Sequence, residues 1–376
     1  MNKVQSKAPT AIDLFAGAGG MTEGLRKAGF RSVLANEYDE MAAHTFAVNH
    51  PEVPVIVKDV KALSVDEVLS LTGLKVGELS LISGGPPCQG FSLAGPRFDG
   101  DPRNQMFKEF VRLVDGLKPH VFLFENVAGI LSMSKGDALR AIVLEFEAIG
   151  YKCEYKLVNA AEYGVPQARP RFIMFGVRDG SNFGFPDATH GPIDKTRDLF
   201  DQDLMPYLTV WDALSDLPVI QQGEGEETQF HNGSYVNDFQ RDRRGERNPG
   251  VIFNHRATKH SEEIVRRYAA IPEGGDNSQV PDELRTKKTN VFKLDSQKPS
   301  RTVTCNHRTD LLHPKVPRGT TVREAARLQS FDDDYQFFGN LTRKAKFVTQ
   351  DDQVGNAVPP LLAMALGNHI RKKMKW

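Results

Sequence analysis

The first 179 residues alternate short apolar runs with segments of helical spacing, a pattern typical of an α/β domain. The run 120–127 (HVFLFENV) is almost wholly apolar, as expected for a strand that helices cover on both faces. Several of these runs end in Gly, Pro or acidic residues. The alternation therefore predicts a doubly wound sheet with ligand-binding loops at its carboxyl edge.

The expected elements follow from these two patterns. Strands are expected in 10–20 (ending in a Gly-rich turn), 32–39, 53–60, 78–87, 120–127, 151–160 and 171–179. Helices are expected in 21–29, 40–50, 106–119, 136–150, 321–331 and 359–373.

Beyond Asp179 the composition changes. Residues 180–320 are rich in Gly, Pro, Asn and Asp and show little periodicity, which indicates a smaller, loop-rich domain. The whole chain carries 48 Lys and Arg against 48 Asp and Glu, yet residues 230–320 hold 17 against 11. This excess suggests a polyanionic partner, and a solvated basic surface is an equal alternative.

Composition also excludes several classes of protein. The sequence has no run of 18 or more apolar residues that could span a bilayer as a helix, and MNKVQSKAPT lacks the apolar core of a secretory signal. Cys88, Cys153 and Cys305 are too scattered for a zinc site or a disulfide framework. We therefore expect a reduced intracellular compartment, no membrane association and no bound metal.

The stretch 13–20 (DLFAGAGG) joins the first strand to a helix. Glycines there let the backbone approach a ligand at the carboxyl edge of the sheet. Glu37 ends the second strand, where an acid can bind both ribose hydroxyls, and Asp59 ends the third, where it could accept from an adenine amino group. A nucleoside cofactor is one interpretation; ordinary turn and cap chemistry is the other.

The segment 84–92 (GGPPCQGFS) is the sharpest feature of the chain. A lone cysteine is more often a small buried hydrophobe than a nucleophile. Here, however, prolines fix the backbone before Cys88, and Gly90, Gly95 and Gly100 allow the loop to move. This is the pattern of a nucleophile on a closing loop.

Two further segments carry candidate groups. Glu125 ends an apolar run, so we expect burial to raise its pKa and make it a candidate general acid; Asn126 as a helix cap is the alternative. Arg169 and Arg171 are spaced to share one face of an extended segment, where they could bind a carbonyl, a phosphate or a carboxylate. A solvated edge is the usual alternative for such a pair.

In this order, DLFAGAGG, GGPPCQGFS, FENV, QARPR, TVREAARLQSF and GNAVPP strongly resemble the DNA (cytosine-5) methyltransferase family, in its prokaryotic, restriction-modification form. The resemblance covers the chain apart from the loop-rich insert. It implies a doubly wound mixed α/β sheet of the S-adenosylmethionine-dependent (Rossmann-like) type. It also implies a cofactor-binding catalytic domain (1–179), a target-recognition domain (180–320) and a C-terminal segment (321–376) that completes the catalytic domain.

The resemblance also implies roles for individual residues. Residues implied to bind S-adenosylmethionine, which leaves as S-adenosylhomocysteine, are Asp13, Phe15, Ala16, Gly17, Gly19, Gly20, Glu37, Tyr38, Asp59, Val60, Pro86, Met106, Asn356 and Ala357. Those implied in catalysis are Cys88, Gln89, Glu125, Asn126, Arg169 and Arg171. Those expected to contact DNA are Gln89, Ser92, Arg301 and Thr302.

The implied reaction adds the Cys88 thiolate to carbon 6 of a flipped cytosine, with Glu125 at nitrogen 3 and Arg171 at the 2-carbonyl oxygen. The expected partner is double-stranded DNA, and a cognate restriction endonuclease is a candidate second partner. We expect a monomer in the cytoplasm, associated with the nucleoid if the source is prokaryotic. The alternatives are a same-fold RNA methyltransferase, a catalytically silent DNA-binding relative and, from the Gly turn alone, a nicotinamide dehydrogenase.

Overall fold

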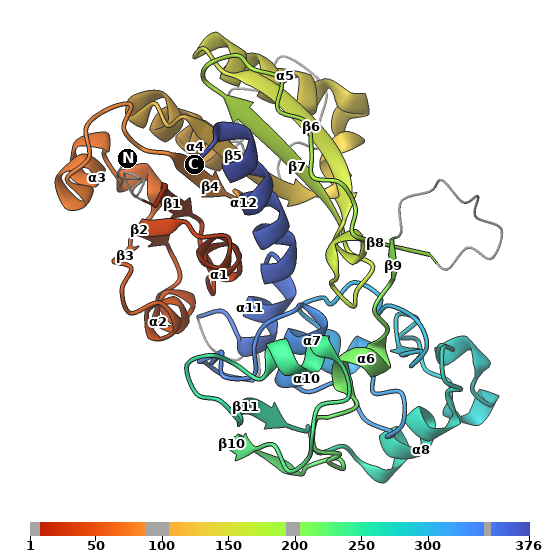
Figure 1. The fold of residues 1–376 in the computed structure, drawn as a ribbon. Coiled ribbons are helices and arrows are strands. Elements are labelled where there is room, and N and C mark those ends of the chain that lie inside the picture. The colour runs from red at the N-terminus through yellow and green to blue at the C-terminus, as the bar shows by residue number, and fades with distance from the viewer. Residues whose placement is uncertain (1–7, 88–104, 193–203, 342–346) are drawn as a thin grey trace. The chain divides into compact units, whose positions relative to one another are not determined.

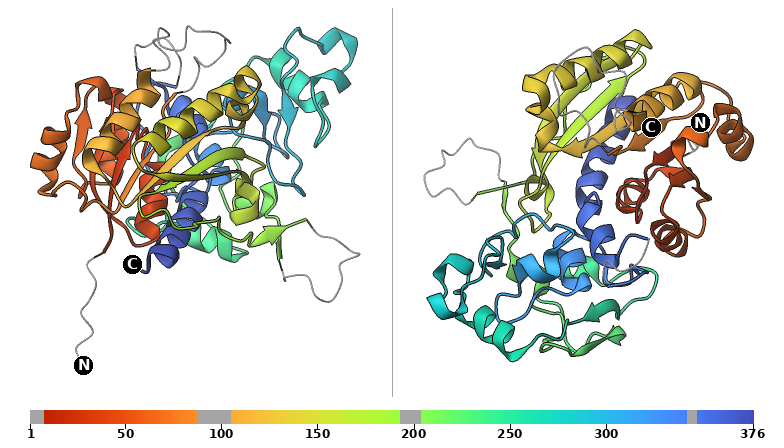
Figure 2. Two further views of the ribbon diagram at one scale, coloured as in Figure 1. Left: turned by 90° about the horizontal axis from the view of Figure 1, so that it is seen from above. Right: turned by 180° about the vertical axis from the view of Figure 1, so that it is seen from behind.

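The computed structural model describes residues 8–87, 105–192, 204–341 and 347–376 (Figures 1 and 2). The chain forms two compact units. Unit 1 comprises Met1–Asn159, Pro170–Asp187 and Ala363–Trp376, and unit 2 comprises Ala160–Arg169 and Ala188–Leu362. The functional boundaries expected at residues 179 and 320 stay a prediction.

A seven-stranded sheet forms the centre of unit 1, in the order β3-β2-β1-β4-β5-β7-β6 (Figure 1). The first five strands in this order are parallel, whereas β7 runs antiparallel to both β5 and β6. The mixed α/β sheet confirms the predicted fold class. The strands are β1 (Thr10–Leu14), β2 (Arg31–Glu37), β3 (Val55–Val57), β4 (Leu81–Gly84), β5 (Val121–Val127), β6 (Lys152–Asn159) and β7 (Pro170–Val177).

Helices cover both faces of this sheet (Figures 1 and 2). On one face α3, α4 and α5 share a core with the strands, in which the rings of Phe122 and Phe146 stack at 4.0 Å. On the other lie α1, α2 and the end of α12, where Gly367 packs against Ala28. The helices are α1 (Gly20–Lys27), α2 (Glu40–Asn49), α3 (Val65–Thr72), α4 (Gln105–Leu117), α5 (Asp137–Ala148) and α12 (Pro360–Met374).

The predicted strands and helices of unit 1 are all confirmed, most of them with shorter bounds, and one helix was not predicted. That helix is α3, whose signals are local: the Ser64 hydroxyl accepts from the Glu67 N–H, and Gly73 ends the helix with φ of 68°. Ser at the N-cap with Glu three residues on is a capping signature that the sequence displays. β3 is also shorter than expected, so Asp59 follows the strand by two residues instead of ending it.

The sheet register aligns three carboxyl ends. Leu14 of β1 pairs with Gly84 of β4, and Gly84 pairs with Phe124 of β5. The order reverses between β1 and β4, which is where open α/β sheets bind ligands. Because β7 is antiparallel, its first residues lie at this same edge, with Arg171 opposite Val127.

Unit 2 consists of short elements joined by long connections. Its helices α6, α7 and α8 lie in the region expected to be loop-rich, and the predicted helix at 321–331 is confirmed as α10, where Thr321 and Glu324 form a capping box. The bounds are β8 (His190–Gly191), β9 (Met205–Pro206), α6 (Val210–Leu214), β10 (Gly225–Phe230), α7 (Asp238–Arg243), β11 (Val251–Arg256), α8 (Glu262–Ala270), β12 (Phe292–Lys293), α9 (His307–Asp310), β13 (Leu311–Leu312), α10 (Val322–Leu328) and α11 (Gln350–Asn356).

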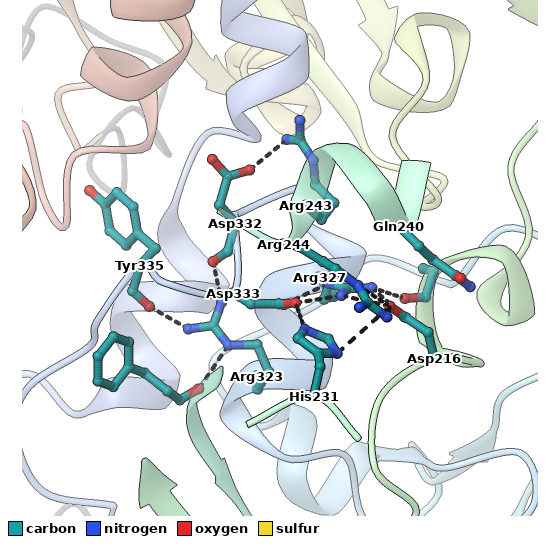
Figure 3. A network of polar contacts seen from close by, with 12 residues as sticks. Asp216, His231, Gln240, Arg243, Arg244, Arg323, Arg327, Asp332, Asp333 and Tyr335 are labelled. Atoms are coloured by element: carbon teal, nitrogen blue, oxygen red, sulfur yellow. Dashed lines mark hydrogen bonds and ion pairs between the residues drawn. The ribbon is translucent and has the colours of Figure 1, made fainter. Parts of the chain in front are cut away.

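The core of unit 2 contains a buried polar network (Figure 3). Arg327 of α10 is fully buried and donates to Asp216 Oδ1 at 2.9 Å and to Asp333 Oδ1 at 2.6 Å. His231 Nε2 lies 2.7 Å from Asp333 Oδ2. Burial, the largest single effect, would raise the pKa of Asp333, but the charge of Arg327 and the hydrogen bonds from His231 and Arg327 together outweigh it and lower that pKa. The network therefore ties α10 to Asp216, which follows α6, and to Asp333 within the core of unit 2.

Candidate active site

The turn after β1 is built from left-handed backbone positions. Phe15, Gly17 and Gly19 have φ of 57°, 55° and 94°. A Cβ added to Gly17 would meet no atom within 4 Å, so the backbone there borders open space. The Gly17 N–H donates to Glu37 Oε2 at 2.8 Å, which fixes the turn to the end of β2. The turn therefore has room for a ligand beside a carboxylate.

Glu37 is held by three backbone donors. In addition to Gly17, the N–H groups of Tyr38 and Asp39 each donate to Glu37 Oε1 at 2.8 Å. Burial raises the pKa of Glu37, and these hydrogen bonds oppose the increase. Tyr38 itself is 73% exposed, so its ring is available to a ligand.

Asp13 lies deeper, inside β1. It is 3% exposed and accepts from Thr22 Oγ1 at 2.7 Å and from Ser83 Oγ at 2.8 Å. Burial raises the pKa of Asp13 to about 6, against the lowering effect of both hydroxyls. Asp13 thus connects α1 to β4 beneath the turn. Its two hydroxyl partners were not predicted, because each becomes a neighbour only when the sheet forms.

The other cofactor candidates of unit 1 have varied surroundings. Asp59 accepts from the Lys61 N–H at 3.0 Å and so caps the short 3-10 helix Val60–Ala62, in which Val60 is buried. Phe15 and Met106 are both half-buried against the main core of unit 1. Phe15 and Met106 therefore border the same apolar surface.

A residue of β5 binds the chain at the start of the segment 84–92, which carries Cys88 and is called the Cys loop below. Cys88, Gln89 and Ser92 lie outside the described residues, which end at Pro87 on this side of the loop. Asn126 Nδ2 donates to the Pro86 carbonyl at 2.9 Å. Asn126 is only 6% exposed, and its Oδ1 accepts from the Val127 N–H. Its amide therefore holds the last described turn before the loop.

Glu125 and Arg171 form an ion pair at this edge. Arg171 Nε lies 3.0 Å from Glu125 Oε1, and the two side chains are 11% and 12% exposed. Burial lowers the pKa of Arg171, while Glu125 opposes that decrease. A Cβ on Gly85 would lie 2.9 Å from Glu125 Oε2, so the Glu125 carboxylate lies directly beside the backbone that follows β4. The carboxylate accepts hydrogen bonds and the guanidinium donates them, so the pair matches an amide-like ring edge, in which a donor lies beside a carbonyl acceptor.

The remaining candidates lie in unit 2. Arg169 is fully buried and donates to the Val303 carbonyl, so the two arginines expected to share a face have different partners. The guanidinium of Arg301 lies 3.7 Å from the ring centroid of Phe292. Thr302 Oγ1 donates to the Ala168 carbonyl at 2.9 Å. Asn356 ends α11, and Ala357 follows it.

Comparison with known proteins identifies the chain. A model of the C-5 cytosine-specific DNA methylase family matches residues 10–372. The chain belongs to this family. Its relatives include the Type II methyltransferase M.DdeI of Desulfomicrobium norvegicum, 38% identical over 96% of this chain and 88% of the relative. Another is M1.HphI of Haemophilus parahaemolyticus, 37% identical over 96% of this chain and 87% of the relative.

Solved structures agree with this assignment to the DNA methylases. A protein described as a DNA modification methyltransferase encoded within an E. coli prophage matches with a TM-score of 0.77 at 28% identity, covering 98% of this chain and 100% of that one. The S. pombe Dnmt2 methyltransferase, at 15% identity and a TM-score of 0.59 over 98% of this chain, shares the fold. The predicted family and activity are confirmed: this methylase is a DNA (cytosine-5) methyltransferase, and its family uses S-adenosylmethionine.

Within the residues that the structure describes, no cluster of three or more His, Cys, Asp or Glu side chains could hold a metal ion. Over the same ranges, no helix combines the length and apolar character needed to cross a membrane.

Proposed function

We propose that Cys88 is the nucleophile of this methyltransferase and that Glu125 and Arg171 bind the target cytosine. One observation carries the proposal: Glu125 and Arg171 form a 3.0 Å ion pair at the end of β5, next to the segment that leads into Cys88. Glu125 would contact ring nitrogen 3, and Arg171 would donate to the 2-carbonyl oxygen while holding Glu125 in place.

Carbon 5 of cytosine is too weak a nucleophile to take a methyl group unaided. Addition of the Cys88 thiolate to carbon 6 forms a sulfur–carbon bond and moves electron density into the ring, where Glu125 stabilises it at nitrogen 3 by a hydrogen bond or a proton. Bound S-adenosylmethionine would supply the electrophilic methyl group that carbon 5 of the resulting enamine takes, and breaking of the sulfur–methyl bond would leave S-adenosylhomocysteine. A base then removes the carbon-5 proton, and the carbon–sulfur bond breaks to release the thiolate and 5-methylcytosine.

Asn126 would act by orienting the loop, because its amide already binds the Pro86 carbonyl. A water near Asn126 is our candidate for the base that removes the carbon-5 proton. The target base must leave the duplex to reach this site, as in methyltransferases generally. Gln89 and Ser92 would then lie beside the vacated stack, and Arg169 would support the site.

The carboxyl edge of the sheet fits the cofactor. Gly17 borders open space, and the Glu37 carboxylate beside it would accept from the ribose hydroxyls. Asp59 would take the adenine amino group, with Tyr38 and Val60 beside the adenine. Asp13, Phe15, Ala16, Gly19, Gly20, Pro86, Met106, Asn356 and Ala357 are the other residues that we assign to the cofactor.

DNA contact is assigned to the basic part of unit 2. The exposed Arg301 stacks over Phe292, which would hold a guanidinium ready for a base edge or phosphate, and Thr302 follows it. We also propose that the enzyme is a cytoplasmic, nucleoid-associated monomer. Because its relatives are Type II methyltransferases, a cognate endonuclease that cuts the same site would be its second partner.

The test uses tritiated S-adenosylmethionine and duplex DNA. Transfer of label to cytosine is expected, and duplexes carrying 5-fluorocytosine should trap a covalent adduct, because fluorine cannot be removed as a proton. Cys88→Ser should abolish trapping, whereas Cys153→Ser, a control on a half-buried thiol whose pKa burial raises to about 12, should leave it intact. An adduct with Cys88→Ser would reject Cys88 as the nucleophile.

A further inference from the structure

Arg169 joins two segments of unit 2 that are distant in sequence. Its Nη1 donates to the Val303 carbonyl at 2.8 Å, and its Nη2 donates to the carbonyls of Gly355 at 2.7 Å and Ala357 at 3.0 Å. The Gly355 and Ala357 carbonyls flank Asn356 in the chain. A fully buried guanidinium needs such acceptors, because without them its charge would be removed from water and left without hydrogen-bond partners.

The chain around Arg169, residues 167–169, is also bound to the segment that carries Arg301 and Thr302. The Ala168 N–H donates to the Ser300 carbonyl at 2.8 Å, and Thr302 Oγ1 donates back to the Ala168 carbonyl at 2.9 Å. The Val303 N–H donates to Gln167 Oε1 at 2.8 Å. These three hydrogen bonds therefore hold residues 167–169 and this segment together.

The segment around Asn356 also contacts residues 300–305 directly. A Cβ on Gly355 would lie 2.4 Å from the Cys305 nitrogen, so the two backbones touch at a place where only glycine fits. Cys305 Sγ donates to Asn356 Oδ1 at 3.2 Å, which orients the Asn356 amide. Gln329 Nε2 binds the Val354 carbonyl at 2.6 Å and its Oε1 accepts from Gln167 Nε2 at 3.1 Å.

We infer that Arg169 is a positioning residue that couples DNA engagement to cofactor binding, by locking the Asn356 segment to the segment 300–305. The inference rests on the proposed function, which assigns Asn356 to S-adenosylmethionine and Arg301 and Thr302 to DNA. DNA that orders residues 300–305 then orders Asn356 through Arg169 and Cys305. Coupling of this kind is reciprocal, so bound cofactor also favours the DNA-binding arrangement.

The test compares Arg169→Met with Arg323→Met, a matched control. Arg323 is likewise fully buried in unit 2 and donates to three backbone carbonyls, those of Phe253, Asp332 and Tyr335. Binding of S-adenosylhomocysteine is measured by calorimetry. KM for S-adenosylmethionine and kcat are measured by tritium transfer to PCR-amplified, hence unmethylated, bacterial genomic DNA, below the unfolding temperature of every variant.

Arg169→Met should raise the KM for S-adenosylmethionine and the Kd of S-adenosylhomocysteine about tenfold, with a smaller fall in kcat, whereas Arg323→Met should change neither constant by more than about twofold. Arg169→Lys should lie between wild type and Arg169→Met, because a single ammonium cannot span the three carbonyls. A fall in kcat with unchanged KM, or an equal rise in KM for Arg323→Met, would overturn the inference.

Two further variants keep the outcome interpretable. Asn356→Ala tests the proposed function itself: if it leaves cofactor affinity unchanged, the cofactor assignment fails, independently of Arg169. If Asn356→Ala weakens binding and Arg169→Met does not, the assignment stands and the coupling is overturned. Should Arg169→Met not fold, Cys305→Ala removes the thiol contacts to Asn356 Oδ1 and to the Asp352 carbonyl, and an unchanged KM would then count against the coupling.

Discussion

Arg171 Nε lies 3.0 Å from Glu125 Oε1, on a strand that runs antiparallel to the one that carries the glutamate. This pairing brings the start of β7 to the carboxyl end of β5, so Arg171 meets Glu125 although 45 residues separate them in the sequence. Both side chains are nearly buried, and each restricts the rotamers of the other. The candidate catalytic carboxylate is therefore oriented before any base arrives.

Replacing Arg171 tests this orientation. Arg171→Lys keeps a positive charge but loses the planar fork, so single-turnover methyl transfer should slow on the order of 100-fold. The rate is measured with tritiated S-adenosylmethionine in enzyme excess. Arg140→Lys, on a residue whose side chain is 78% exposed in α5, is the control and should match wild type. A wild-type rate for Arg171→Lys would contradict the role assigned to the pair.

Asn126 provides a second prediction. Asn126→Ala leaves the Pro86 carbonyl without this donor, which should lower the free energy of unfolding by about 1–3 kcal/mol. The larger expected effect is slower adduct formation on 5-fluorocytosine DNA, because the entry to the Cys loop loses its anchor. Urea unfolding and quenched trapping assays measure the two effects separately. If stability falls but trapping keeps its rate, Asn126 has only a structural role.

Asp13 predicts a pH dependence of stability. Its pKa in the folded protein, about 6, is above the ordinary aspartate value, so the folded state holds a proton that the unfolded state has lost. Its contribution is thus fully favourable below about pH 4 and is lost as the pH rises through about 6, a difference of about 3 kcal/mol.

Asp13→Asn should remove this dependence. Urea unfolding of wild type and variant between pH 4 and 8 would show wild type losing stability relative to Asp13→Asn as the pH increases through this window. Curves that stay parallel across the whole range would mean that Asp13 is ionised throughout in the folded protein.

The buried network of unit 2 predicts a pH dependence of stability that is opposite in sign to that of Asp13 (Figure 3). Because the pKa of Asp333 is lowered in the folded state, its stabilisation is present above the ordinary aspartate pKa of about 3.9 and is lost as the pH falls below it. Asp333→Asn should cost about 3–5 kcal/mol at neutral pH, since Arg327 then has one carboxylate fewer.

The control is Asp238→Asn, which breaks the exposed pair with Arg241 and should change the free energy of unfolding by less than about 1 kcal/mol. Both variants are measured by thermal and urea unfolding at pH 7 and at low and high salt. Equal losses for the two variants would show that burial does not strengthen the Asp333 pair.

Much of unit 1 could be predicted from local patterns. The strands and helices around Gly17, Glu37 and Glu125 follow from apolar periodicity and glycine placement, because strand and helix spacing is decided within a few residues. The motif order was specific enough to predict the family that the comparisons show. Apart from α10, the helices of unit 2 were not predicted, because most of them span only a few residues and packing stabilises such helices more than their own sequence does.

Partnerships between distant residues depended on the tertiary structure. The spacing of Arg169 and Arg171 predicted one shared face, yet the fold pairs Arg171 with Glu125 and buries Arg169 among the carbonyls that flank Asn356. Likewise, Asp13 finds Ser83 only because β1 and β4 are neighbours in the sheet. Periodicity specifies which face of an element is apolar, but strand order and direction decide which polar groups meet, and those are set by packing across the whole chain.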